Sequence, residues 1–238
     1  MNRLRMRMLT LVPLTALSGL HFYANQMKLE TFQFSHFAVL YITMIPCFAA
    51  AYYFNKKSPY PLIIIISYII ISAFPYLWSS PVLSDDAYRY IWEGHVQNRG
   101  YNPFLNPPAD PEFKGDPLIE KINFPEIPAV YPPLIQLIFR VLALVSLSMW
   151  FFKLFFLSAL ILTVLVLYKN RKRFGETFFV WAVLPLTIIE TAWSAHFEAV
   201  GVLFLLISIL FLEQSKGLWA GLFLAFSISI KLMPLMFL

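Results

Sequence analysis

Two adjacent aspartates, Asp85 and Asp86, follow within a few residues of an uncharged apolar run from Pro61 to Trp78. Ser84 is a favourable N-cap, so both carboxylates are predicted to lie in the first turn of a helix running toward His95. The helix dipole favours negative charge there, which makes this turn the first candidate for chemistry by carboxylates. The alternative is a solvated, well-capped helix at the membrane interface.

Three further ionisable residues lie beside or within apolar segments nearer the C-terminus. His196 and Glu198 stand between two apolar runs in the stretch WSAHFEAV, and Lys231 lies within SISIKLMPL. An ionisable residue inside a membrane segment is costly and is therefore a functional candidate. The alternatives are an ordinary polar turn at His196 and Glu198, and a Lys231 side chain that extends to the interface.

Glu190 is one more acid in an apolar run, with Arg140 or Lys153 as a candidate partner. The sequence contains no Gly-rich phosphate loop, no HExxH motif and no GxSxG motif. Without a nucleotide-binding loop, chemistry outside the membrane needs a substrate delivered through the lipid. Lipid-linked phosphosugars meet this need.

The composition indicates a membrane protein. Of the 238 residues, 59% are hydrophobic and 13% are charged, whereas a soluble chain carries about 25% charged residues. Several uncharged runs approach the roughly 20 residues that cross a bilayer as a helix. The single Cys47 lies in an apolar run, which argues against a disulfide or a thiolate metal site. The net charge of +5 fits loop orientation in a membrane better than nucleic-acid binding, and we expect no nucleic-acid partner.

An all-α, polytopic transmembrane bundle is predicted, as a single domain over 1–238. The expected membrane segments are Met8–Tyr23, Phe34–Phe54, Pro59–Trp78, Pro132–Leu147, Met149–Tyr168, Thr177–Trp193, Phe197–Leu212 and Leu218–Leu238. Three helices thus fill 1–78, and further membrane helices fill 132–238. Because the sequence stops inside an apolar run, KLMPLMFL, we expect a chain truncated at its C-terminus.

One long polar segment, Ser79–Tyr131, separates the third and fourth apolar runs. It holds eight of the thirteen acidic residues and eight prolines. Gly100 is suited to end the first helix of this loop, and the prolines after Tyr131 are suited to open the next one. All other connections are short, so this loop, with its juxtamembrane helix, is where a site outside the bilayer could be built.

Basic residues predict the orientation. Arginines near the N-terminus and Lys56–Lys57 indicate cytoplasmic ends, which places the long loop on the outer face. If both Pro132–Leu147 and Met149–Tyr168 cross, however, the basic run Lys169–Arg173 lies outside, against the positive-inside rule. Either Pro132–Leu147 lies along the interface or only partly enters the membrane, which we favour, or the rule fails here. In both cases His196–Glu198 and Lys231 are predicted to lie on one side.

The acidic block resembles a known family. The stretches DDAYRYIWEG from Asp85 and GYNPF from Gly100, then YPPL from Tyr131, resemble the first outer loop of GT-C glycosyltransferases. The block is similar to that of the bacterial polyprenol-phosphate-mannose-dependent α-mannosyltransferases, and more distantly to the catalytic subunit of GPI mannosyltransferase I. The turn at His196–Glu198 and the Lys231–Pro234 stretch extend the likeness. Family members are usually longer, and distant relatives separate the two acids by one residue.

The resemblance implies a GT-C-like enzyme of the bacterial inner membrane. It would move a hexose, with mannose expected first, from a polyprenyl phosphate to a hydroxyl of a glycan or lipid acceptor. One aspartate would act as general base, and the other would orient it or hold a divalent cation; which does which stays open. The implied site comprises the catalytic Asp85 and Asp86 and the substrate-binding Arg89, Tyr131, His196, Glu198 and Lys231. The alternatives are an inactive remnant and a lipid-linked-sugar transporter or flippase component.

Overall fold

The computed structural model describes residues 3–27 and 31–237, and within these ranges it contains helices and no strand. The all-α prediction is therefore confirmed. The longer helices are α1 (Arg3–Ala24), α2 (Phe34–Lys57), α3 (Leu62–Leu77), α4 (Asp86–Asn98), α5 (Pro133–Val145), α6 (Met149–Lys169), α10 (Glu198–Glu213) and α11 (Gly217–Ile230). The shorter ones are η2 (Pro111–Phe113), η3 (Ile119–Lys121), α7 (Arg171–Phe174), α8 (Thr177–Val183), α9 (Pro185–Ile188), η4 (Ile189–Trp193) and η5 (Met233–Phe237).

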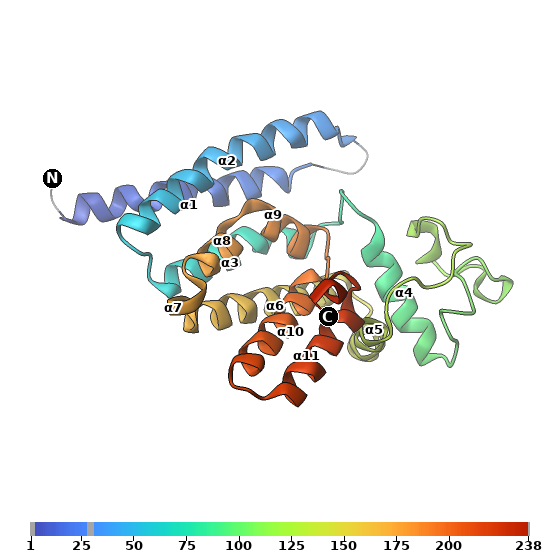
Figure 1. The fold of residues 1–238 in the computed structure, drawn as a ribbon. Helices are drawn as coiled ribbons and strands as arrows, with labels where there is room; N and C mark the ends of the chain where they lie inside the picture. Colours follow the sequence, from blue (N-terminus) through green and yellow to red (C-terminus); the bar gives the residue numbers. More distant parts are fainter. Residues whose placement is uncertain (1–2, 28–30, 238) are drawn as a thin grey trace.

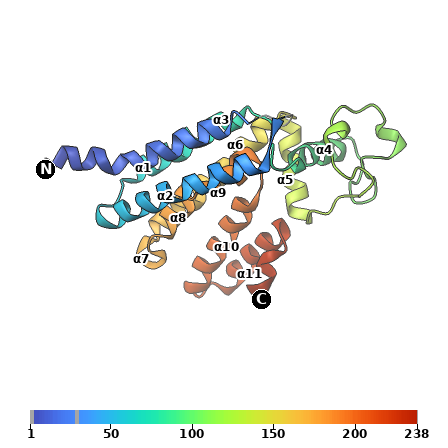
Figure 2. The same ribbon diagram turned by 90° about the horizontal axis from the view of Figure 1, so that it is seen from above.

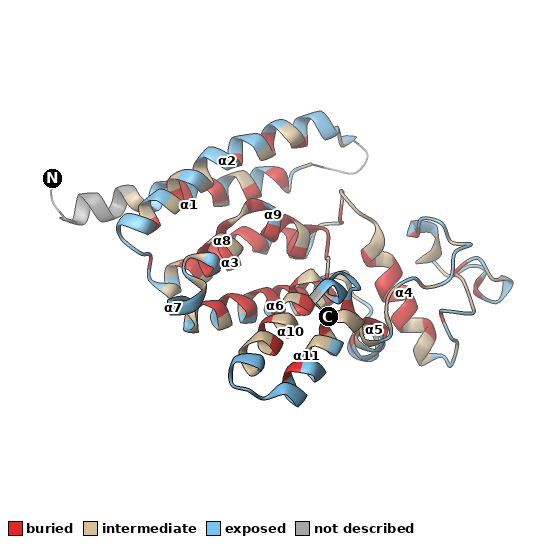
Figure 3. Ribbon diagram, viewed as in Figure 1, coloured by how far each residue is buried: buried red, intermediate tan, exposed pale blue. Residues whose placement is uncertain are grey.

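Helices α1, α2, α3 and α6 run along one another, with α8 and α9 packed against them (Figures 1 and 2). The α10–α11 hairpin packs on α6, and α4 packs on α5 at the end of the bundle that carries the long loop. Buried residues concentrate where these helices meet, while much of α2 is exposed (Figure 3). Exposed apolar residues on α2 fit a surface that faces lipid.

Fewer helices could cross a membrane than the sequence patterns suggested. Among the described residues, α2 and α6 are long and apolar enough, and a third span exists if Pro185–Trp193 and Glu198–Glu213, bent by 117°, count as one. With 24 and 21 residues, α2 and α6 are roughly 36 and 32 Å long. Of the eight predicted apolar segments, two or three therefore correspond to full spans by length and composition.

Prolines explain two of the differences between the predicted and the observed helices. The predicted Thr177–Trp193 helix breaks between α8 and α9, because Pro185 has no N–H to continue the backbone ladder. The predicted Leu218–Leu238 helix ends at Ile230. Pro234 lacks the N–H that would bond to the Ile230 carbonyl four residues earlier. Lys231 consequently lies at the end of α11 in an extended conformation and not inside the helix.

The length of helix α5 bears on whether Pro132–Leu147 crosses the membrane, and so on which side the basic run Lys169–Arg173 lies. The helix has 13 residues, about 20 Å, which is short of the roughly 30 Å hydrocarbon core. It packs against α4 instead of extending through the bundle. By its length alone α5 is too short for a full span, and its position along the interface stays a prediction.

Helices α4 and α5 approach each other unusually closely at Gly94. A Cβ atom at this position would lie 2.2 Å from the Phe139 carbonyl oxygen and 2.9 Å from Ala143 Cβ. The Tyr90 and Phe139 rings stack beside this contact, with centroids 4.7 Å apart. On another side of α4, Trp92 packs edge-on against Phe113 of the loop. Helix α4 is therefore fixed between α5 and the loop.

Candidate active site

The two aspartates lie at the start of α4 but face different partners. The helix begins at Asp86, so Asp85 occupies the N-cap position predicted for Ser84, although its side chain makes no capping bond. The Ser84 hydroxyl accepts a hydrogen bond from the Asp86 backbone N–H at 3.3 Å. Asp85 Oδ2 accepts one from the Asn123 N–H at 3.2 Å. The Asp86 side chain is 48% exposed.

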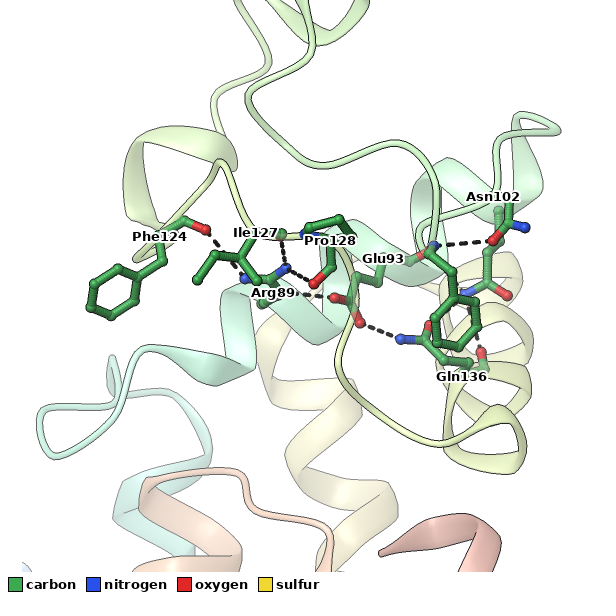
Figure 4. A network of polar contacts seen from close by, with 9 residues as sticks. Arg89, Glu93, Asn102, Phe124, Ile127, Pro128 and Gln136 are labelled. Atoms are coloured by element: carbon green, nitrogen blue, oxygen red, sulfur yellow. Dashed lines mark hydrogen bonds and ion pairs between the residues drawn. The ribbon is translucent and has the colours of Figure 1, made fainter.

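Arg89 lies four residues after Asp85, a spacing at which two side chains on a helix can pair, but its partner is Glu93. Its Nε donates to Glu93 Oε1 at 2.9 Å, one turn further along α4. Its terminal nitrogens donate to the backbone carbonyls of Phe124, Ile127 and Pro128 (Figure 4). The guanidinium is thus occupied by the loop, and Arg89 fastens residues 124–128 onto α4.

Glu93 completes this buried network. Its second carboxylate oxygen accepts a hydrogen bond from Gln136 Nε2 of α5 at 2.5 Å (Figure 4). Burial raises the pKa of the Glu93 carboxyl, and the hydrogen bonds from Arg89 and Gln136 partly offset that rise. The network therefore joins α4, α5 and the loop through one buried ion pair.

The loop conformation that Arg89 holds is strained. Phe124 has a φ of +50°, a left-handed conformation that costs a residue with a Cβ roughly 1–2 kcal/mol. Its carbonyl accepts one of the Arg89 hydrogen bonds. The neighbouring Asn123 N–H is the group that binds Asp85. Arg89 thus helps to position the backbone that contacts the first aspartate.

His196 connects the aspartates to a segment more than 100 residues away. It stands outside the helices, in the turn between the π-helical η4 and α10. Its Nε2 lies 4.0 Å from Asp86 Oδ2, and its Nδ1 lies 2.5 Å from Glu190 Oε2. Burial disfavours the imidazolium, but the Glu190 hydrogen bond and the charges of Glu198, Glu190 and Asp86 outweigh it and raise the pKa of His196.

Lys231 and Glu198 lie together at the same end, as predicted. Lys231 Nζ forms an ion pair with Glu198 Oε1, between the end of α11 and the start of α10. Half of the Lys231 side chain stays exposed. The other oxygen, Glu198 Oε2, is buried and has no hydrogen-bond partner among the described residues. The ammonium is consequently held at the site without being fully enclosed.

Tyr131 links these groups through an aromatic cluster. Its ring lies edge-on to Tyr90 and Phe197, with centroids 5.1 and 5.6 Å away. Phe197 lies directly between His196 and Glu198 in the chain. Tyr131 also lines a cavity of about 220 Å³ that includes both aspartates. All predicted site residues therefore gather at the loop end of the molecule.

The comparison with protein families agrees with this arrangement. Residues 19–238 match the family described as alpha-(1->6)-mannopyranosyltransferase, N-terminal domain. The chain belongs to this mannosyltransferase family. No curated protein and no solved structure matches the chain. The match confirms the resemblance carried by the acidic block and favours sugar transfer over transport.

Several groups of the candidate site in this mannosyltransferase were not predicted from the sequence. Glu190 pairs with His196, not with Arg140 or Lys153. Lys153 instead donates hydrogen bonds to the Tyr76 and Ser79 carbonyls, both at 2.8 Å. The roles of Glu93 and Gln136 were also missed. Only the four-residue spacing from Arg89 to Glu93 could have signalled one of them.

A divalent cation at the aspartates stays a prediction. In the ranges 3–27 and 31–237 there is no group of three or more His, Cys, Asp or Glu side chains placed to hold a metal ion. Asp85 and Asp86 also face different neighbours, Asn123 and His196 respectively. We therefore assign no reaction step to a cation.

Proposed function

We propose that this mannosyltransferase moves a mannosyl group from a polyprenyl phosphate to an acceptor hydroxyl at the outer face of the bacterial inner membrane. The observation that carries the proposal is the convergence of Asp86 with His196 and of Glu198 with Lys231 at the loop end. Carboxylates and cations are there together, as phosphate departure and hydroxyl attack require.

The distribution of basic residues supports this orientation. Lys56–Lys57 end α2, and Arg171–Arg173 lie in α7, at the end of the bundle opposite the loop (Figure 1). A hydrogen bond from Asn55 to Glu176 joins these two segments. By the positive-inside rule, this arrangement supports an outer position for the loop and its aspartates.

The donor lipid would reach the site beside Lys231. Exposed apolar side chains lie on two neighbouring elements: Leu137, Val141 and Leu144 on α5, which packs against α11, and Leu232 and Met233 directly after Lys231. Such a surface suits an isoprenoid chain in the bilayer. The donor phosphate would then lie at the Lys231 ammonium, where the polar end of the hairpin meets the loop.

The reaction needs one proton acceptor and stabilisation of one leaving group. An aspartate takes the proton of the acceptor hydroxyl while that oxygen forms a bond to the mannose C1 atom. The bond from C1 to the phosphate oxygen breaks, and the polyprenyl phosphate leaves with the electron pair. Lys231 and protonated His196 offset the charge that develops on it. Arg89 acts indirectly, as a positioning residue.

The test of the donor assignment is Lys231→Met. We expect transfer from radiolabelled polyprenyl-phosphate mannose, measured with purified protein in liposomes, to fall by about 10². Lys216→Met, at the opposite end of α11, is the matched control and should transfer normally. Glu198→Gln shows whether the effect comes only from the unpaired carboxylate. An unchanged rate and donor KM in Lys231→Met would remove Lys231 from the site.

The charge of His196 predicts a pH dependence. The pKa of its imidazole is raised from the ordinary 6.5, so transfer should decline as the pH rises through this raised value. Glu190→Gln removes the hydrogen-bonded charge and should move the decline to lower pH. The measurement is kcat/KM against pH for both proteins, with Glu112→Gln on the loop as control. A decline at the same pH in Glu190→Gln would exclude this pairing as its cause.

A further inference from the structure

A second, larger cavity lies beside Asp85, and neither Lys231 nor Glu198 lines it. Its volume is about 780 Å³, within the range of small-molecule sites. The end of α1 at Asn25, the Ser79–Asp85 link between α3 and α4, and η3 with Asn123 form its walls. It thus opens at the loop end, where a water-soluble molecule can enter.

The wall chemistry suits a hydroxylated ligand. Hydroxyl, amide and charged side chains line the cavity, among them Ser84, Asn123 and Lys121. Asn25 Oδ1 is buried and accepts no hydrogen bond from the described residues. Tyr88 also lines the cavity, and Lys121 Nζ lies over its ring, 5.2 Å from the centroid. These groups match the alternating hydroxyls and apolar faces of a sugar chain better than a hydrocarbon chain.

Buried side chains of the helix bundle donate hydrogen bonds to the backbone that forms one wall of this cavity. Lys153 donates hydrogen bonds to the Ser79 carbonyl at 2.8 Å, and the Trp193 indole N–H donates to the Ser80 carbonyl at 3.2 Å. The Lys153 side chain is fully buried. The wall is therefore fixed before any ligand arrives, which reduces the cost of binding.

Three residues line both cavities: Asp85, Ile122 and Asn123, of which Asp85 carries the carboxylate. Asp85 lines the 780 Å³ cavity, whereas Asp86 does not; both line the 220 Å³ cavity next to Arg89 and Tyr131. Asp86 is also the aspartate near His196. Resting on the function proposed above, we propose that the acceptor sugar chain binds in the 780 Å³ cavity. Its hydroxyl then meets Asp85, which acts as the general base, while Asp86 faces the donor.

Photoaffinity labelling tests the site without requiring turnover. The probe is an α(1→6)-linked mannobiose carrying a diazirine, applied to the full chain in liposomes. Labelled peptides identified by mass spectrometry should fall in 79–88 or 118–123, and unlabelled mannobiose should compete. Tyr88→Leu and Asn25→Leu should reduce labelling about fivefold or more. Tyr53→Leu is the matched control, because Tyr53 also lies beside a lysine, Lys57, but at the opposite end.

The outcomes separate this inference from the proposed function. Labelling that maps elsewhere, or that Tyr88→Leu and Asn25→Leu leave unchanged, overturns the acceptor site. Absence of competable labelling up to millimolar probe overturns it as well. A separate assay of mannosyl transfer from polyprenyl-phosphate mannose tests the proposed function. Transfer by the same preparation without labelling of this cavity would contradict only the acceptor site.

Discussion

Asp85→Asn should lower mannosyl transfer by about 10²–10⁴-fold, the contribution of a positioned general base. An amide at this position can still accept the hydrogen bond that Asp85 Oδ2 receives from the Asn123 N–H. It cannot take a proton from the acceptor hydroxyl. The variant should therefore keep its fold and its membrane insertion and lose the chemical step.

The measurement is transfer of radiolabel from polyprenyl-phosphate mannose, with protein amount and membrane insertion determined in parallel. Asp86→Asn should also impair transfer, with an effect on donor KM because Asp86 lies near His196. Glu112→Gln changes an exposed acid of the same loop and should leave the rate unaltered. Full activity of both aspartate variants would show that neither carboxylate is the base.

The second large effect is expected for Arg89→Met. Removing one partner of a buried ion pair typically costs about 3–5 kcal/mol, because the other charge stays buried and unpaired. Here that charge belongs to Glu93, which is fully buried. The loop residues 124–128 also lose the donors that hold them. We expect a lower free energy of unfolding, faster trypsin cleavage at Lys121, and weaker transfer.

The destabilisation of Arg89→Met should depend on pH. Burial already raises the pKa of the Glu93 carboxyl above its ordinary 4.5, and loss of the guanidinium raises it further. Below about pH 4.5 the Glu93 carboxyl is protonated in both the folded and the unfolded chain, so the loss of unfolding free energy in Arg89→Met is small. It grows as the pH rises, because only the unfolded chain then ionises Glu93 freely.

Two variants sharpen this prediction. Arg89→Lys keeps the charge but cannot reproduce the planar set of donors, so it should restore part of the stability and little of the loop order. Arg99→Met removes an exposed arginine at the other end of α4 and serves as the matched control. If Arg89→Met and Arg99→Met unfold at the same denaturant concentration at pH 7, the network does not support the loop.

Much of the site's location could be predicted from residue types. The uncharged runs predict helices, and the single long polar segment marks the end at which acids can collect. Counting helices between Glu198 and Lys231 predicts that they share a side, and their ion pair confirms this. These inferences need only the direction of each helix, which hydropathy and basic residues indicate well.

Side-chain partners were harder to predict, because local spacing competes with tertiary contacts. Arg89 is four residues from both Asp85 and Glu93, and burial beside Gln136 makes Glu93 the partner. Glu190 reaches His196 only because η4 is a π-helix and Ala195 adopts a φ of +60°, which no pattern in the sequence indicates. Helix lengths were overestimated because apolar runs continue past the prolines that end the helices.

The contact at Gly94 limits how this protein and its relatives can vary. The Phe139 carbonyl oxygen leaves no room for even a methyl group at position 94. The distance between α4 and α5 is therefore fixed by this contact. A relative that carries alanine or a larger residue there must open a gap between its juxtamembrane helices. Position 94 therefore serves as a sequence marker, telling which homologous chains can share this loop geometry and which must hold their acids differently.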